Sequence, residues 1–247
     1  MTDQKILPVI VRKEVDDKHY YFVNEQYYPS VTAILDEAAP VGFGLRNWLL
    51  NNTAESAEEI KNTTADLGTK MHDAFQSLLL GNKLNLADDF KLMKEKKHIA
   101  TFCQWFADFA PDISTIQTEH TVASVTHKYA GTLDLAIRKD GELWIVDFKT
   151  GSGIYFSHEL QLTAYKFAYE EMYGVKVDHV AVLRTGSRHK SGYEFKEIVR
   201  DFSEFERVYG TYLALHDGKI PDPPVMDAYP LEVQLFVPAI KPKGVTK

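Results

Sequence analysis

Three charged side chains near the middle of the chain are spaced so that one hairpin would bring them together. Asp134 precedes the dipeptide Asp140-Gly141, and Asp147 and Lys149 follow it. This dipeptide favours a two-residue type I′ turn, because both central positions of such a turn need positive φ. A hairpin closed there places Asp134 directly opposite Asp147, with Lys149 on the same face. The spacing therefore predicts a compact cluster of two carboxylates and one ammonium group.

Metal-assisted chemistry is the use that such a cluster suggests. Opposed carboxylates repel and destabilise a sheet, and a divalent cation bound by both offsets that repulsion. Two hard oxygen ligands suit Mg²⁺ or Mn²⁺, and a lysine beside the metal can position or deprotonate a water. A solvated surface hairpin is the simpler alternative. Against it, both strands carry apolar residues that we expect to share the opposite face: Leu133, Leu135, Ile137, Trp144, Val146 and Phe148.

Further candidate residues lie on predicted helices and on a neighbouring strand. Gln161 and Tyr165 share one helix face, and Gln161 can reach a water or a phosphate oxygen. His72 has the spacing of a core-facing residue, either packed and hydrogen-bonded or serving as a metal ligand. Imidazole with two carboxylates suits Mn²⁺ and tolerates Mg²⁺. Glu119 on the first predicted core strand is either a further ligand or a solvated side chain.

Five further residues are candidates for contacts with a phosphate group or a nucleic-acid strand. Ser30 or Thr32 is expected to cap the helix that follows Pro29, although a helix N-terminus also can hold a phosphate. Arg46 and Trp48 could grip and stack on a single strand, or be a surface arginine and a core tryptophan. Thr150 directly follows Lys149 at the point where the backbone changes direction.

The overall composition narrows the class of protein. The chain has 247 residues, 45% of them hydrophobic and 26% charged, as in an ordinary globular protein. Its single cysteine, Cys103, excludes a disulfide framework and a Cys-ligated iron–sulfur cluster within the chain. The net charge of −7 argues against a surface that is basic throughout, but not against a local basic groove. With no signal or membrane segment in the sequence, we expect a cytoplasmic protein with no membrane partner.

The elements predicted around these residues form one α/β (α+β) domain over residues 1–247. We expect a central mixed β-sheet flanked by helices. An N-terminal hairpin and helical region covers 1–110, a core 111–200, and a C-terminal helix and tail 201–247. The predicted elements are a hairpin in 5–28, helices at 29–35, 45–51, 53–80, 90–109, 154–173 and 202–217, and strands at 113–124, 128–138, 142–149, 177–184 and 193–199.

Four short patterns in this order resemble the PD-(D/E)XK nuclease superfamily and its RecB-type branch. They are an upstream histidine (His72), Gly-x-x-Asp (131–134), Asp-x-Lys (147–149) and Gln-x-x-x-Tyr (161–165). Two further segments, Pro-Ser-Val-Thr at 29–32 and Gly-Thr-x-x-His at 68–72, resemble segments of phage-encoded exonucleases and of the mitochondrial genome maintenance exonuclease. The resemblance covers about residues 28–185. It implies a restriction-endonuclease-like core and a protein of a bacterial or phage-infected host cell.

The resemblance also implies roles for the site residues. His72, Asp134, Asp147 and the backbone carbonyl of Phe148 would hold Mg²⁺ or Mn²⁺, as one ion or two. Lys149 would orient or activate the attacking water, and Gln161 and Tyr165 would position the scissile phosphate. No iron–sulfur cluster is expected, because the cysteines that some RecB-type nucleases use for it are missing.

The function implied is a metal-dependent deoxyribonuclease, with three readings open. The first is an exonuclease that acts on single-stranded DNA or free ends in recombination, repair or replication. Its candidate protein partner is a single-strand annealing or recombination protein. The second is a structure-specific or restriction-type endonuclease. The third is an inactive nucleic-acid-binding accessory protein, although none of the expected site residues is missing.

Overall fold

Two antiparallel or mixed sheets form the frame of the protein. The computed structural model describes residues 6–15, 18–42, 50–187 and 189–223. A five-stranded sheet has the order β4-β5-β6-β7-β8, and a small three-stranded sheet has the order β1-β2-β3. The bounds of the strands are β1 Ile10–Val15, β2 Lys18–Val23, β3 Gln26–Tyr28, β4 Asp112–Ser124, β5 Tyr129–Lys139, β6 Glu142–Lys149, β7 His179–Arg184 and β8 Glu194–Glu197.

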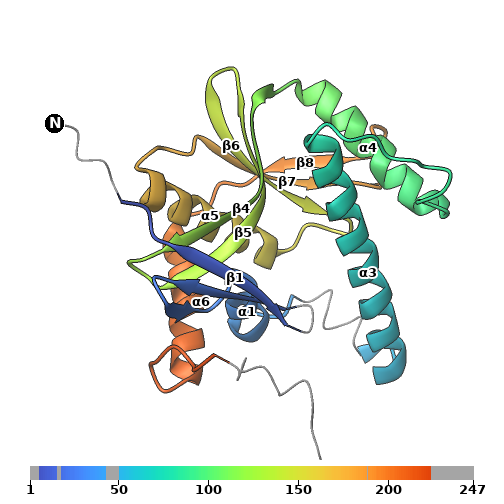
Figure 1. Ribbon diagram of the computed structural model, residues 1–247. Coiled ribbons are helices and arrows are strands. Elements are labelled where there is room, and N and C mark those ends of the chain that lie inside the picture. Colours follow the sequence, from blue (N-terminus) through green and yellow to red (C-terminus); the bar gives the residue numbers. More distant parts are fainter. Residues whose placement is uncertain (1–5, 16–17, 43–49, 188, 224–247) are drawn as a thin grey trace, which may run out of the picture.

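Helices cover both faces of the larger sheet, as Figure 1 shows. They are α1 Val31–Ala38, α3 Ala54–Leu79, α4 Met93–Phe109, α5 Phe156–Tyr173 and α6 Phe202–Leu215. One apolar cluster joins α1, α5 and α6 to the sheet and to the small sheet, and a second joins α3 and α4 to the opposite face. The expected mixed sheet with helices on its faces is confirmed.

The connection from β6 to β7 makes the sheet mixed. These two strands are parallel, from Trp144 opposite His179 to Lys149 opposite Arg184, whereas the other neighbours are antiparallel. A parallel pair needs a crossover, and α5 provides it. The carboxyl end of β6 therefore leads directly into the helix that packs beside it. This places the residues after Phe148 and those of α5 at one edge of the sheet.

Two details differ from the sequence-based expectations. The N-terminal hairpin has a third strand, because Asn24 and Glu25 both take positive φ (48° and 69°) and close a tight turn into β3. Leu133 packs in the cluster with α5 and α6, whereas Leu135 and Ile137 pack against α3 and α4. The expected single apolar face is therefore wrong at Leu133. Most of the helix expected at 45–51 lies outside the described residues.

Candidate active site

The β5–β6 hairpin closes as its turn residues predict. Asp140 and Gly141 both have positive φ (53° and 87°), and the register runs from Lys139 opposite Glu142 to Leu135 opposite Val146. The next pair in this register would be Asp134 and Asp147, where the backbone ladder stops. There the Phe148 N–H donates a 2.6 Å hydrogen bond to Oδ2 of Asp134 instead. The carboxylate is thus tied to the opposite strand at the place where the strands part.

A chain of polar contacts links β6 to α5. Lys149 Nζ lies 2.7 Å from Oδ2 of Asp147, which is buried and accepts no further hydrogen bond from the described residues. The same ammonium donates to Oε1 of Gln161 at 3.3 Å, and the Gln161 amide donates to the Tyr165 hydroxyl at 3.0 Å. The buried Gln161 orients its carbonyl towards the lysine because its amide is committed to the tyrosine.

Helix α3 brings His72 to the same place. Its Nε2 donates to the carbonyl oxygen of Phe148 at 3.0 Å, and its Nδ1 lies 3.3 Å from Oδ1 of Asp134. The helix buries Met71 and Phe75 beneath it, and Phe75 packs edge-on against the ring of Phe148. The histidine is therefore held over the strand by apolar packing of its own helix.

Glu119 of β4 completes the closest group of possible metal ligands among the described residues. One ligand atom each from His72, Glu119 and Asp134 lie within 4.8 Å of one another. Asp147 is not in this group, since its carboxylate faces Lys149. Glu119 has a left-handed φ of 50°, which is uncommon for a residue with a Cβ. The register of β4 against β5 nevertheless runs unshifted past this residue, from Thr118 opposite Leu135 to His120 opposite Leu133.

Burial and the neighbouring charges shift the pKa values of the two aspartates in opposite directions. Burial raises the pKa of Asp147 to about 6, and the charge of Asp134 adds to the rise, although Lys149 opposes it. Burial also favours the neutral form of Asp134, but His72, Lys149 and the Phe148 N–H together hold its pKa below the usual value. The repulsion expected between the two carboxylates is therefore expressed as a raised pKa at Asp147 only.

The acidic neighbours favour the charged forms of Lys149 and His72. Burial acts to lower the pKa of Lys149, but Asp147 and Asp134 hold it above the usual value. Burial likewise acts to lower the pKa of His72, and Asp134 more than offsets it. Lys149 is consequently a protonated donor here, suited to orienting and to charge stabilisation rather than to removing a proton.

Gly131 and Tyr165 fit each other directly. A Cβ added to Gly131 would lie 2.5 Å from Cε1 of Tyr165, a distance that real atoms do not tolerate. Tyr165 is buried, and its hydroxyl accepts the hydrogen bond from the Gln161 amide described above. The glycine on β5 thus lets the tyrosine of α5 lie flat against the strand, which gives a physical reason for both residues.

The residues expected to contact nucleic acid are placed unevenly. Ser30 is buried and caps α1, with its hydroxyl accepting from the Ala33 N–H at 3.0 Å, and the exposed Thr32 lies 3.0 Å from it. The half-buried Thr150 lies at the end of β6, close to Gly68 of α3. Arg46 and Trp48 lie outside the described residues.

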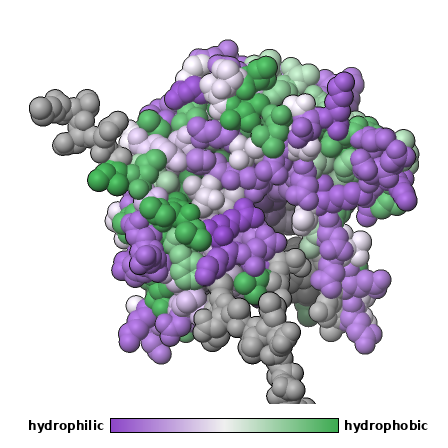
Figure 2. All heavy atoms as spheres, viewed as in Figure 1, coloured by the Kyte–Doolittle hydropathy of each residue, from purple (hydrophilic) through white to green (hydrophobic). Residues whose placement is uncertain are grey.

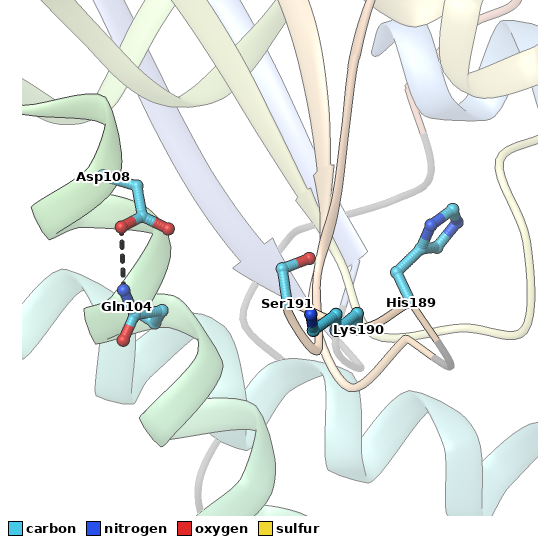
Figure 3. Close-up of a pocket in the computed structure, with 5 residues that line it drawn as sticks. All are labelled: Gln104, Asp108, His189, Lys190 and Ser191. Atoms are coloured by element: carbon cyan, nitrogen blue, oxygen red, sulfur yellow. Dashed lines mark hydrogen bonds between the residues drawn. The ribbon is translucent and has the colours of Figure 1, made fainter.

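Other features of the surface are separate from this cluster. A shallow pocket lies between α4 and the turn before β8, where Gln104 and Asp108 face His189, Lys190 and Ser191 (Figure 3). None of the site residues described above lines it. No helix within the described ranges is long and apolar enough to cross a membrane.

The donor set fits a hard divalent cation. Ligand atoms of His72, Glu119 and Asp134 lie within 4.8 Å of one another, and the Phe148 carbonyl oxygen lies 3.0 Å from Nε2 of His72. Mixed nitrogen and oxygen donors of this kind suit Mn²⁺ and Mg²⁺. The buried Oδ2 of Asp147, with only Lys149 as partner, is a further oxygen that a cation could satisfy. Sequence reasoning missed Arg12 and Thr132 beside Glu119, because no local pattern marks them.

A comparison with curated proteins gives no match. Among solved structures, an alkaline exonuclease from Laribacter hongkongensis is 10% identical over 77% of this chain and 88% of its own, with a TM-score of 0.40. A candidate exonuclease from Eubacterium rectale is 14% identical over 80% of this chain and 90% of its own, with a TM-score of 0.45.

The sequence also matches a family model, and the match runs through the cluster described above. It covers residues 44–215, which include α3 with His72, the β5–β6 hairpin and α5. The chain therefore belongs to the PD-(D/E)XK nuclease superfamily.

Proposed function

We propose that this protein is a Mg²⁺- or Mn²⁺-dependent deoxyribonuclease, and more specifically an exonuclease that acts on single-stranded DNA ends. The observation that carries the proposal is the convergence of Asp134, Asp147, Lys149 and Gln161 with His72 at one edge of the sheet. The preference for ends rests on the resemblance of the sequence to the RecB-type branch.

Each residue of the cluster would have a separate role in phosphodiester hydrolysis. His72, Asp134, Asp147 and the Phe148 carbonyl would hold the cation, with Glu119 as a further ligand. A divalent cation lowers the pKa of a bound water and neutralises charge that builds up on phosphoryl oxygens. Lys149, kept protonated by its two acidic neighbours, donates a hydrogen bond to the water or to a phosphoryl oxygen. Gln161 fixes the position of that ammonium, and Tyr165 fixes Gln161.

One digestion experiment separates the three readings. Linear and closed circular single-stranded DNA, labelled and at matched concentration, are incubated with the protein and Mg²⁺ or Mn²⁺, beside the Lys149→Ala variant. We expect the linear strand to be degraded, the circle to be spared, and the variant to bind DNA without cutting it. Nicking of circles would support an endonuclease, and absence of any cleavage by the wild-type protein would support an accessory role. Activity of Lys149→Ala within a few-fold of wild type would refute the assigned site.

A further inference from the structure

The N-terminal sheet reaches the site strands through a few polar side chains. Arg12 on β1 lies 107 positions before Glu119, yet its Nη1 is 3.4 Å from Oε2 of that residue and 3.5 Å from Oγ1 of Thr132. The Tyr21 hydroxyl on β2 lies 3.0 Å from the same Thr132 oxygen. On the face that carries β1 and α3, Figure 2 shows hydrophilic side chains around a hollow between these two elements.

The strand register determines which side chains face the site. Arg12 is paired with Tyr21, and Lys13 with Tyr20, so the two basic residues occupy opposite faces of the small sheet. Arg12 faces β4 and β5, as its contacts show. Lys13 lies on the other face, with its ammonium 4.9 Å from the ring centre of Phe22. The Arg12 side chain is 31% exposed, so a ligand can still reach it.

The charge available to pair with Arg12 depends on whether Glu119 also binds a cation. Glu119 is its nearest carboxylate, and the same carboxylate belongs to the group formed with His72 and Asp134. A cation held by that group draws on the charge of Glu119. The carboxylate that then remains beside the guanidinium is Glu14, whose Oε2 lies 3.9 Å from Nη2 of Arg12 and whose side chain is 60% exposed. A pair this long and exposed is weak, so the guanidinium can still bind a further anion. The His19 ring accepts from Nη2 of Arg12 at 2.8 Å, which steadies the guanidinium plane. A planar guanidinium presents a fork of N–H donors that matches phosphate oxygens.

We propose that Arg12 binds a backbone phosphate of the nucleic acid next to the catalytic cluster, so that the small sheet forms one wall of the substrate site. The inference rests on the proposed function, because a nucleic-acid substrate supplies the phosphate. It goes beyond the family match, which begins at residue 44 and includes none of the small sheet. Arg12 is a substrate-positioning residue in this arrangement.

The test compares three substitutions in the full chain: Arg12→Ala, Arg12→Lys and Lys13→Ala. Each is made in the wild-type and Lys149→Ala backgrounds. Binding of a labelled, 5′-phosphorylated single-stranded oligonucleotide is measured by fluorescence anisotropy with Mn²⁺ at several salt concentrations, and kcat and KM are measured in the wild-type background. Thermal melts check each fold. Lys13→Ala is the matched control, since it removes the same charge from the other face of the same strand.

We expect Arg12→Ala to weaken binding by ~10-fold or more and to raise KM. The negative slope of log affinity against log salt concentration should become smaller in magnitude by about 0.7, because one phosphate contact is lost. Arg12→Lys should keep the salt slope and the melting temperature but not restore affinity, because an ammonium lacks the fork. If the arginine only neutralised Glu119, lysine would restore binding fully, and that result would overturn the inference. Equal affinities for Arg12→Ala and Lys13→Ala would overturn it as well. Weaker binding by Arg12→Ala in a protein that never cleaves would sustain it and refute the proposed function instead.

Discussion

Asp134 and Asp147 have the same side chain, but their burial and their hydrogen-bond partners differ. Asp134 receives the Phe148 N–H and faces His72, whereas the more deeply buried Asp147 has only Lys149. The first carboxylate is therefore stabilised in its charged form and the second is not. The sequence predicts repulsion between these two opposed carboxylates. The contacts indicate that removing the charge of Asp147, and not that of Asp134, should relieve it.

Asp147→Asn should raise the stability of the metal-free protein at neutral pH. The folded-state pKa of Asp147 rises from 3.8 to about 6, which corresponds to at most ~3 kcal/mol of destabilisation above pH 6. The unfolded chain releases this proton near pH 4 and the folded protein near pH 6. The wild-type protein therefore loses this part of its stability as the pH rises between those values, and the benefit of the substitution should disappear below about pH 4.

Thermal melts in EDTA at pH 4 and pH 7.5 check this prediction. Asp134→Asn is the control and should lower the melting temperature at pH 7.5, because the pKa of Asp134 is held below its usual value and its charge stabilises the fold. An equal gain from Asp147→Asn at both pH values would show that the charge of Asp147 is not what destabilises the protein.

Among the elements, the β5–β6 hairpin was the most predictable. Its turn, its register and the convergence of Lys149 with Asp147 follow from the spacing around Asp140-Gly141, because local turn geometry determines them. The positions of Glu119 and Arg12 do not follow from local sequence. Glu119 depends on an uncommon backbone angle within β4, and Arg12 on the docking of a separate sheet. Long-range contacts of this kind leave no pattern in a single sequence.

Gly131→Ala tests the fit between β5 and α5. Its new methyl group would meet the ring of the buried Tyr165 at 2.5 Å, and neither element can move freely. We expect a loss of about 1–3 kcal/mol in the free energy of unfolding, typical of overpacking in a core, together with impaired cleavage. Gly151→Ala is the matched control, since a Cβ there meets nothing within 4 Å. Equal unfolding free energies in urea for the two variants would contradict this fit.

At the scale of the whole molecule, the ligand set joins elements from both sides of the core. His72 comes from α3, which packs in one apolar cluster, while Leu133, next to Asp134, belongs to the other. Metal binding should therefore stabilise the entire fold and not just one hairpin. The N-terminal sheet belongs to the same unit, because its residues Tyr21, Val23 and Tyr28 are buried in the cluster with α5 and α6.

Mn²⁺ should raise the melting temperature of the wild-type protein by mass action, since the unfolded chain binds the ion poorly. His72→Ala should lose most of that rise, because it removes the imidazole of the closest ligand group. His189→Ala, which changes an exposed histidine away from the site, should keep it. Calorimetric titration of the same proteins gives the dissociation constants. An unchanged value for His72→Ala would mean that this histidine only packs against the Phe148 carbonyl.

The hairpin closed by Asp140 and Gly141 also has a kinetic consequence. Its two strands can pair within about 1–10 μs, whereas contacts to His72 and Glu119 must wait for the slower docking of α3 and β4. The complete ligand set then exists only after the folding transition state. We therefore expect Mn²⁺ to slow unfolding while leaving the refolding rate nearly unchanged. Stopped-flow measurements in denaturant, with and without the ion, would show one arm of the chevron moving and the other staying in place. The bound ion would then prolong the lifetime of the folded state without speeding its formation.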